Sequence, residues 1–242
     1  MKTSHFSFDP NLTALLPRAQ RTAELEHHFS GPQSAKHLIE SLGIPHTEVG
    51  SILSAGRQVS LNYQVHDGDR IEVRSASAEA DTGDEPRFVL DGHLGRLSSG
   101  LRMLGLDCLY RGDYQDDELA VLSVSQSRTL LTRDRRLLMR KSISKGYLVR
   151  SLDPRQQLAE LTHRFRLEKW LRPFSRCIRC NGLLRPVDKQ VVVNQLQPLT
   201  RLHFEEFHIC PSCGQIYWKG SHVEKMMKAI SGLRPQGAVR MR

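Results

Sequence analysis

From residue 87 onwards, short runs of apolar residues alternate with segments in which apolar residues recur at helical spacing. The apolar runs, which predict strands, are 87–91, 106–110, 128–132 and 146–150. The segments with helical spacing, which predict helices, are 93–104, 116–126, 134–141 and 153–165. Strands that alternate with helices are typical of a parallel sheet with right-handed crossovers. We therefore predict an α/β domain over residues 87–170.

A different pattern fills residues 1–75. The segment 34–43 begins with Ser34 as a helix N-cap and ends at Gly43, and Asp67-Gly68-Asp69 predicts a turn before a last strand. This order of elements predicts a small β-grasp domain. It resembles the ubiquitin-like sulfur carriers, which often have a similar turn but end in Gly-Gly. Because this chain continues through Arg74-Ser75-Ala76 instead, we predict a binding or structural module that docks on a protein partner.

Composition and charge separate these two regions. Residues 76–86 are small and acidic, so they predict a linker, and a second boundary falls near 171. Residues 1–75 hold seven Lys and Arg against eight Asp and Glu, whereas residues 87–242 hold 28 against 14. A basic surface of this kind attracts polyanions, of which nucleic acid is the commonest, although the same charge also favours solubility. The asymmetry favours RNA or DNA as a partner.

Four of the five cysteines predict a metal site in residues 171–242. They form two CxxC pairs, and they are Cys177, Cys180, Cys210 and Cys213. An odd cysteine count without an export signal argues against a disulfide framework. Two such pairs supply the closed tetrahedral S₄ shell of a structural zinc ion. A redox pair or an iron–sulfur cluster is the competing interpretation. We predict a zinc ribbon over 171–242, with a C-terminal helix near 221–231 and with Cys108 as a buried core residue.

Aromatic and basic residues surround the predicted zinc ribbon. Trp218 and Lys219 follow the second pair of cysteines, and Arg179 lies within the first. Such residues can stack on unpaired bases and hold phosphates. We expect Lys219 to bind RNA, while Trp218 is expected to pack in the small core of the ribbon. The nearby histidines, His203, His208 and His222, are expected at the surface or in packing, since four thiolates already fill the metal shell.

Acidic residues follow the predicted strands of the α/β domain. Asp91 follows the first strand, Asp116, Asp117 and Glu118 come after the second, and Asp134 follows the third. The carboxyl ends of parallel strands lie at one edge of a sheet, where such folds place their sites. Gathered carboxylates favour hard cations such as Mg²⁺ or Mn²⁺. The competing interpretation is that these acids cap helices, with Asp116, Asp134 and Asp153 as N-cap candidates.

The motifs of residues 87–142 resemble the ribonuclease family named after the C-terminal region of the Mut-seven exonuclease, which belongs to the PIN-like nucleases. The matching elements are LDGHLGRL with Asp91, the acidic helix start at 116–118, LLTRD with Asp134, and the cysteine motifs at 173–184 and 210–222. Members of this family can also carry a ubiquitin-like N-terminal domain. The resemblance implies a PIN-like parallel sheet flanked by helices. It also implies metal-binding roles for Asp91 and Asp134, with Asp116 or Glu118 as the third ligand and Asp153 as a weaker fourth.

These observations together predict a ribonuclease that depends on Mg²⁺ or Mn²⁺ and uses a structural zinc ribbon to help bind RNA. Three arginines flank Asp134 and are expected to hold substrate phosphates: Arg133, Arg135 and Arg136. The alternative is a nucleic-acid-binding adaptor on an inactive nuclease fold. No apolar run approaches the roughly 18–20 residues of a membrane helix, and no apolar signal core is present, so we expect a cytoplasmic protein without membrane contact.

Overall fold

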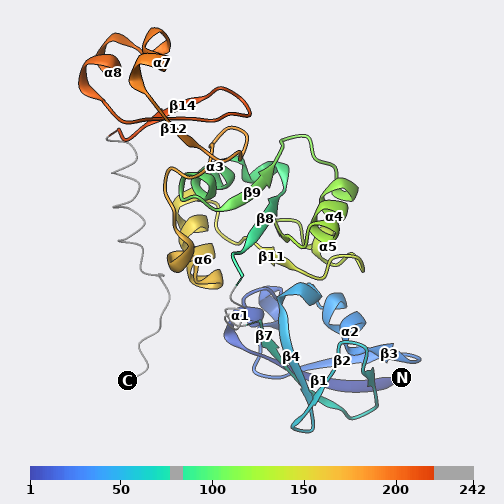
Figure 1. Ribbon diagram of the computed structural model, residues 1–242. Coiled ribbons are helices and arrows are strands. Elements are labelled where there is room, and N and C mark those ends of the chain that lie inside the picture. The colour runs from blue at the N-terminus through green and yellow to red at the C-terminus, as the bar shows by residue number, and fades with distance from the viewer. Residues whose placement is uncertain (77–83, 221–242) are drawn as a thin grey trace, which may run out of the picture. The chain divides into compact units, whose positions relative to one another are not determined.

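The computed structural model describes residues 1–76 and 84–220 (Figure 1). The helix predicted near 221–231, His222 and most of the predicted linker 76–86 lie outside the described residues. The chain divides into two compact units. The first unit joins residues 1–82 with 115–148, and the second joins 83–114 with 149–242. The α/β region predicted from the sequence therefore contributes segments to both units.

A five-stranded sheet with the order β2-β1-β7-β4-β5 forms the N-terminal part of the first unit. Its strands are β1 (Lys2–Phe8), β2 (Leu25–Phe29), β4 (Val49–Ser54), β5 (Arg57–Val59) and β7 (Arg70–Ser75). The first and last strands, β1 and β7, pair in parallel, and the other neighbours are antiparallel. This arrangement fits the predicted β-grasp domain.

Helix α2 (Ala35–Ser41) supplies much of the core of this domain, because Leu38 and Ile39 on it are buried. The Ser34 hydroxyl accepts a hydrogen bond from the His37 N–H, which confirms the predicted N-cap. Gly43 follows the helix with a φ of +90°, a conformation that favours glycine. Shorter elements complete the domain: α1 (Pro10–Thr13), η1 (Arg18–Gln20), β3 (Gln33–Ser34), η2 (His46–Glu48) and β6 (Gln64–Val65).

Residues 115–148 form two helices and two strands in the same unit. They are α4 (Asp116–Ser125), β10 (Thr129–Thr132), α5 (Arg135–Leu138) and β11 (Gly146–Leu148). Asp116 was predicted as an N-cap candidate, but the N-cap of α4 is Gln115. Glu118 accepts a hydrogen bond from the Gln115 N–H, and the Gln115 side chain bonds the N–H of Glu118 in return, so a reciprocal capping box outcompetes a single aspartate.

Buried polar contacts fasten residues 115–148 to the β-grasp domain. The Leu148 N–H donates to the carboxylate of buried Glu48 at 2.7 Å. The His46 ring lies with one nitrogen 2.7 Å from the Ile143 carbonyl and the other 2.7 Å from the Glu40 carboxylate. Because buried polar groups need specific partners, these contacts fix one orientation of the two segments.

The second unit contains the other parallel strand pair, β8 (Arg87–Leu90) and β9 (Asp107–Tyr110). Helices α3 (Gly95–Met103) and α6 (Pro154–Phe165) lie side by side in this unit (Figure 1). Their apolar faces are buried, and Phe88 meets Phe165 edge to face at 5.3 Å. Asp153 caps α6 as predicted, and two 3-10 turns lie in the same part of the unit: η3 (Gly92–Leu94) and η4 (Leu167–Trp170).

The strands of the α/β region form one pair in each unit, β10 with β11 in the first and β8 with β9 in the second. Both the β8–β9 pair and the β10–β11 pair are parallel, which confirms the predicted type of sheet. Cys108 on β9 is fully buried, as predicted. Among the described residues, no helix has the length and apolar composition needed to span a membrane.

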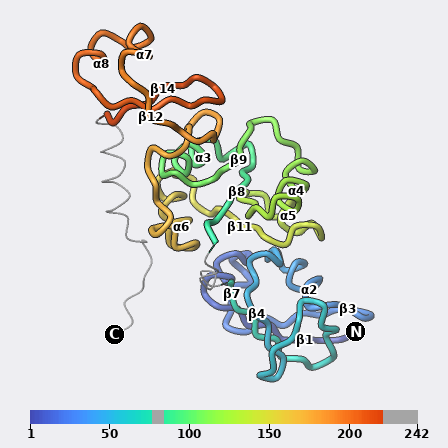
Figure 2. Tube along the Cα trace, in the orientation of Figure 1, coloured from blue at the N-terminus to red at the C-terminus, as the bar shows by residue number. Residues whose placement is uncertain are grey.

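The cysteine-rich region forms a small antiparallel sheet of β12 (Arg185–Val187), β13 (Phe207–Ile209) and β14 (Ile216–Trp218). Between β12 and β13 the chain forms α7 (Lys189–Val192), η5 (Val193–Gln195) and α8 (Pro198–His203) (Figure 2). No helix was predicted between the two cysteine pairs. Helices form because Asp188 caps α7 and Pro198 occupies the first turn of α8.

The core of this ribbon is very small. Val192, Leu196, Phe207 and Ile216 are buried, and the partly buried Trp218 packs against them. The expected packing role of Trp218 is thus confirmed. So few apolar groups stabilise a domain weakly, which is why small domains of this kind use a metal ion.

Candidate functional site

The four cysteines converge at one point between the two CxxC turns. Their sulfur atoms all lie within 4.8 Å of one another, with 3.6 Å between Cys177 and Cys213 and 3.4 Å between Cys180 and Cys210. These separations exceed the roughly 2.05 Å of a disulfide bond. A tetrahedral ion with sulfur ligands at about 2.3 Å requires sulfur–sulfur distances of about 3.8 Å. The four thiols therefore fit a metal ion such as zinc.

The two turns have the same backbone geometry. The Cys177 carbonyl accepts the Asn181 N–H at 2.9 Å, and the Cys210 carbonyl accepts the Gly214 N–H at 2.8 Å. Asn181 and Gly214 both have positive φ angles, +69° and +72°. Gly182 fits because a Cβ there would lie 3.1 Å from the Cys210 sulfur. Each turn thus places a residue with a positive φ angle directly after its second cysteine.

The surroundings of the sulfur atoms shift the pKa values of Cys177 and Cys180 in opposite directions. Burial opposes ionisation of Cys177, but a hydrogen bond from Tyr217 and bonds from its neighbours outweigh that effect and lower its pKa to about 7. Burial and the adjacent thiols raise the pKa of Cys180 to about 12. Four sulfurs this close cannot all be thiolates without a cation, because like charges repel. A bound cation would offset the repulsion between the thiolates.

Tyr217 on β14 supports the first turn directly. Its hydroxyl lies 3.1 Å from the Cys177 sulfur and also accepts the Ile178 N–H at 3.1 Å. Burial, followed by the proximity of Cys177, raises the pKa of Tyr217, so its proton stays in place to be donated. Hydrogen bonds to metal ligands orient them and tune their affinity. The CxxC spacing did not predict that Tyr217 would contact the cysteine site.

Buried Arg102 on α3 connects the first cysteine turn to strand β9. Its guanidinium donates to the carbonyls of Ile178 and Arg179, both at 3.0 Å, and to the Cys108 carbonyl at 2.9 Å. Only an arginine supplies a planar fork with enough donors for acceptors in several directions. The sequence did not single out Arg102, since an arginine in an amphipathic helix usually faces solvent.

Asn181 strengthens the same connection. Its side-chain carbonyl accepts the Cys108 N–H at 3.1 Å, and its amide donates to Asp107 at 2.9 Å. Arg176 also pairs with Asp107, at 3.5 Å, and donates to the Gly105 carbonyl. The cysteine turn is therefore an integral part of the unit that contains β8 and β9.

Asp91, the first candidate catalytic residue, follows β8 in the second unit and is partly buried. The backbone beside it is tightly packed, because a Cβ on Gly92 would lie 2.8 Å from the Gly112 carbonyl oxygen in the loop after β9. The Tyr110 hydroxyl donates to the Gly92 carbonyl at 2.9 Å. In that loop, the hydrogen-bonded Arg111 guanidinium lowers the pKa of Asp113. The loops after the two parallel strands thus meet, as the sequence predicted for strand ends.

Three further candidates, Asp116, Glu118 and Asp134, are exposed in the first unit. Asp116 lies 3.6 Å from Arg140, which also binds Asp117. Glu118 belongs to the capping box, and Asp134 caps α5 by accepting the Arg136 N–H at 2.7 Å. Within either unit, the described carboxylates do not form a second group with the close spacing of the cysteines. Glu118 and Asp134 thus take part in helix capping, which is the competing interpretation that the sequence offered for these acids.

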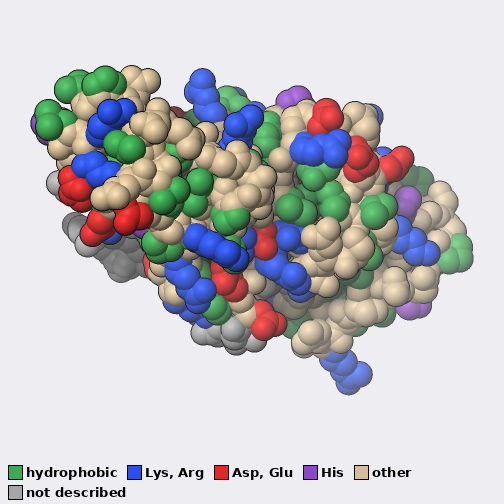
Figure 3. Space-filling model, turned by 45° about the horizontal axis from the view of Figure 1, so that its top comes forward, with side chains coloured by type: hydrophobic (Ala, Val, Ile, Leu, Met, Phe, Trp, Pro, Cys, Tyr) green, Lys and Arg blue, Asp and Glu red, His purple; other side chains and the backbone are tan. Residues whose placement is uncertain are grey.

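The four candidate RNA-binding residues have different surroundings. Arg133 and Arg136 are exposed on either side of Asp134. Arg135 instead donates to the carbonyls of Leu15 and Gly43 in the β-grasp domain, at 2.7 and 3.2 Å. Lys219 is exposed and lies 3.6 Å from Glu206. On the face shown in Figure 3, Lys and Arg side chains are interspersed with Asp and Glu.

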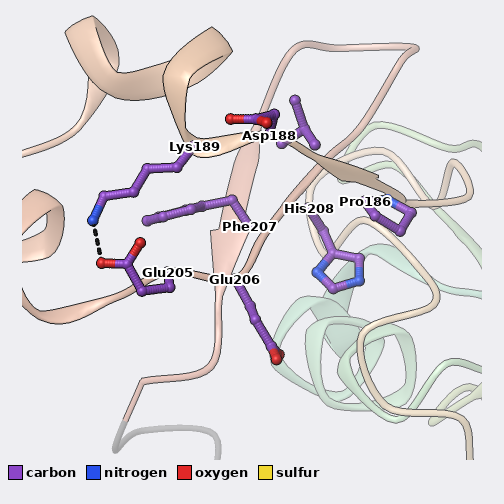
Figure 4. Close-up of a pocket in the computed structure, with 8 residues that line it drawn as sticks. Pro186, Asp188, Lys189, Glu205, Glu206, Phe207 and His208 are labelled. Carbon is purple, nitrogen blue, oxygen red and sulfur yellow. Dashed lines mark hydrogen bonds and ion pairs between the residues drawn. The ribbon is translucent and has the colours of Figure 1, made fainter.

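Described residues of the ribbon line a larger and a smaller pocket. The larger, of about 530 Å³, is lined by Asp188, Glu205, Glu206, His208 and neighbours, and its Lys189 is tied to Glu205 at 2.5 Å (Figure 4). Its three carboxylates make it unsuitable for a phosphate. The smaller, of about 330 Å³, lies beside the second cysteine turn, and no described residue of its lining carries a carboxylate.

Comparison with known proteins identifies both parts of the chain. The family model described as Mut7-C RNAse domain matches residues 86–230, and the model described as Mut7-C ubiquitin matches residues 1–81. No curated protein and no solved structure matches the chain. The order of the two family matches along the chain is the order predicted from the sequence. The Mut7-C RNAse match covers more than half of the 242 residues. The chain therefore belongs to the Mut7-C RNAse domain family, and it also contains a Mut7-C ubiquitin-like domain.

Proposed function

We propose that this chain is a ribonuclease that cleaves RNA phosphodiester bonds with a divalent cation, Mg²⁺ or Mn²⁺. The observation that carries the proposal is the Mut7-C RNAse match over residues 86–230. The proposed ligands of the cation are Asp91, Asp116, Glu118 and Asp134. Their carboxylates suit a hard cation, and three of the four are exposed. Such an ion, when bound, activates water and stabilises the leaving oxygen.

The positions of these residues on their own strands and helix support the proposal. Asp91 directly follows β8, and Asp134 comes two residues after β10, so both stand at the carboxyl ends of strands that belong to parallel pairs. Open α/β sheets bind ligands outside the carboxyl ends of their strands. Asp116 and Glu118 lie in the first turn of α4, where the helix dipole also favours negative charge.

Exposed cations would hold the RNA backbone near these carboxylates. Arg133 and Arg136 are proposed for this role, because both flank Asp134 and both are exposed. We propose a smaller share for Arg135, whose guanidinium already binds two carbonyls of the β-grasp domain. Lys219 is proposed to bind RNA on the ribbon, whose four cysteines we assign to structural zinc.

One observation favours the alternative, a nucleic-acid-binding adaptor that does not cleave. Arg140 pairs with Asp116 and Asp117, and the carboxylates of Glu118 and Asp134 bond to backbone N–H groups. Acids engaged in this way need no cation. Under either function, the β-grasp domain is proposed to bind a protein partner, and a cytoplasmic location stays a prediction.

Labelled RNA incubated with the protein and Mn²⁺ tests the proposal. We expect cleavage by the natural protein and a loss of roughly 100-fold or more in Asp91→Asn and Asp134→Asn, because an amide cannot supply the charge that a divalent cation requires. Asp188→Asn is a matched control, since Asp188 caps α7 in the way that Asp134 caps α5 and asparagine retains the cap. Unchanged cleavage in both variants would reject the assigned carboxylates, and binding without any cleavage would favour the adaptor.

A further inference from the structure

The smaller pocket on the ribbon combines groups that recognise an unpaired nucleobase. Its lining includes three glutamines, one arginine and one tryptophan: Gln195, Gln197, Gln215, Arg179 and Trp218. Each glutamine amide offers a hydrogen-bond donor and an acceptor, as the edge of a base requires. The volume of about 330 Å³ is at the lower end of the range for small-molecule sites, which suits a single nucleotide.

We propose that this pocket binds one unpaired base of single-stranded RNA, with the base against Trp218, its edge on the glutamine amides and the adjoining phosphate at Arg179. The proposal rests on the RNA-binding part of the proposed function. It adds a defined site and a chemical class of ligand that are independent of the carboxylates.

The polar groups of the pocket are available. Gln195 and Gln197 are exposed, and their side-chain amides form no hydrogen bond within the part of the chain that the structure describes. The Arg179 guanidinium is exposed and forms no ion pair with any described residue. By contrast, the Gln215 side-chain amide donates to the Ile216 carbonyl at 3.2 Å, and its side-chain carbonyl remains as an acceptor.

The framework of the pocket is held in place. Trp218 packs against Phe204 and Phe207 with ring centroids 6.2 and 6.4 Å away, so the ring is held in place while it lines the pocket. The Arg179 carbonyl accepts from buried Arg102 at 3.0 Å, which fixes the backbone beneath the guanidinium. A pre-organised pocket loses less entropy on binding than a mobile one.

The two ribbon pockets differ in charge, and the difference favours the smaller one for RNA. The larger pocket has Asp188, Glu205 and Glu206 in its lining, and its Lys189 is already paired (Figure 4). Among the described residues, the lining of the smaller pocket contains no acid, and its arginine forms no ion pair. Only the smaller pocket therefore attracts the phosphate that accompanies every base.

The pocket also depends on the cysteine site, because Cys213 and Gly214 form part of its wall and Arg179 precedes Cys180. Removal of the metal would release these turns. RNA binding at this pocket is thus expected to require the metal, although the metal itself does not touch the base.

Tryptophan fluorescence tests the proposal in the full-length protein. The chain has two tryptophans, so Trp170→Phe leaves Trp218 as the reporter. A single-stranded oligoadenylate is titrated without divalent cation, so that no cleavage takes place. We expect quenching of Trp218, and binding about 10-fold weaker in Gln195→Leu and in Arg179→Ala. Both changes are at exposed positions that the fold does not need.

The ribbon offers matched controls. Gln190→Leu and Arg185→Ala change exposed residues of the same types outside the pocket, and both are expected to bind as the parent does. Polyphosphate, which has charge but no bases, is expected to leave Trp218 unquenched. Three results would overturn the proposal: equal losses in pocket and control variants, equal quenching by polyphosphate, or RNA binding without a change at Trp218. Because cleavage is measured separately with the Asp91 and Asp134 variants, failure of the pocket and failure of the nuclease assignment are distinguishable.

Discussion

Replacing Tyr217 by phenylalanine removes one hydroxyl from beside the cysteine site and leaves the ring. That hydroxyl lies 3.1 Å from the Cys177 sulfur and accepts the Ile178 N–H at 3.1 Å. Tyr217→Phe therefore removes the hydrogen-bond donor that the Cys177 thiolate would have with a metal ion bound, and it leaves the partly buried Ile178 N–H without this partner. The four cysteines themselves are untouched.

The expected effect is a 10- to 100-fold loss of zinc affinity, the usual consequence of removing a partner of a metal ligand. That range corresponds to about 1.4 to 2.7 kcal/mol. The estimate agrees with the geometry. One lost hydrogen bond to a charged group and one unsatisfied N–H each cost roughly 1–3 kcal/mol, and local rearrangement of the structure recovers part of that cost.

Competition for zinc against a chromophoric chelator measures this loss. Tyr114→Phe serves as the control, since Tyr114 lies under Arg111 at 4.7 Å and away from the sulfur atoms. Zinc affinity of Tyr217→Phe within about twofold of the natural protein, with Tyr114→Phe also unchanged, would refute the supporting role of the hydroxyl.

Two further predictions concern arginines whose guanidinium groups bind backbone carbonyls. Arg102→Met fills similar space but leaves several carbonyls unpaired, so we expect a loss of unfolding free energy on the order of 3 kcal/mol in urea denaturation; a loss below 1 kcal/mol would contradict the connecting role. Arg135→Met is expected to lower the thermal midpoint by several degrees, because the bonds to Leu15 and Gly43 are lost, whereas Arg136→Met leaves it unchanged in the same calorimetric scan. Equal midpoints for the two variants would show that Arg135 does not fasten the β-grasp domain.

The sequence predicted the elements of this fold well where the signal was local. Ser34, Asp153 and Gly43 mark helix ends through their own chemistry, and the structure confirms each. The cysteine group was predictable because CxxC spacing fixes the geometry of each turn. The family resemblance, confirmed by both family matches, depended on the order of several motifs.

Interactions between distant segments were not predictable in this way. Arg102 and Asn181 have no local signal, because the contacts that join the cysteine turn to β9 and α3 connect residues over 70 positions apart in the chain. The same is true of Arg135, whose position beside Asp134 suggested a phosphate ligand although its guanidinium reaches the backbone of another domain. The helices α7 and α8 were missed because their apolar residues are few and the segments short.

The bond between Asn181 and the backbone of Cys108 has a consequence for how the chain can be divided. Strand β9 stands last in its sheet, and an uncovered strand edge invites pairing with a second molecule. The amide side chain occupies part of that edge. The cysteine-rich region thus covers part of this strand edge in addition to bringing four cysteines together, and we expect a shortened chain that ends before it to aggregate although β8 and β9 are still present.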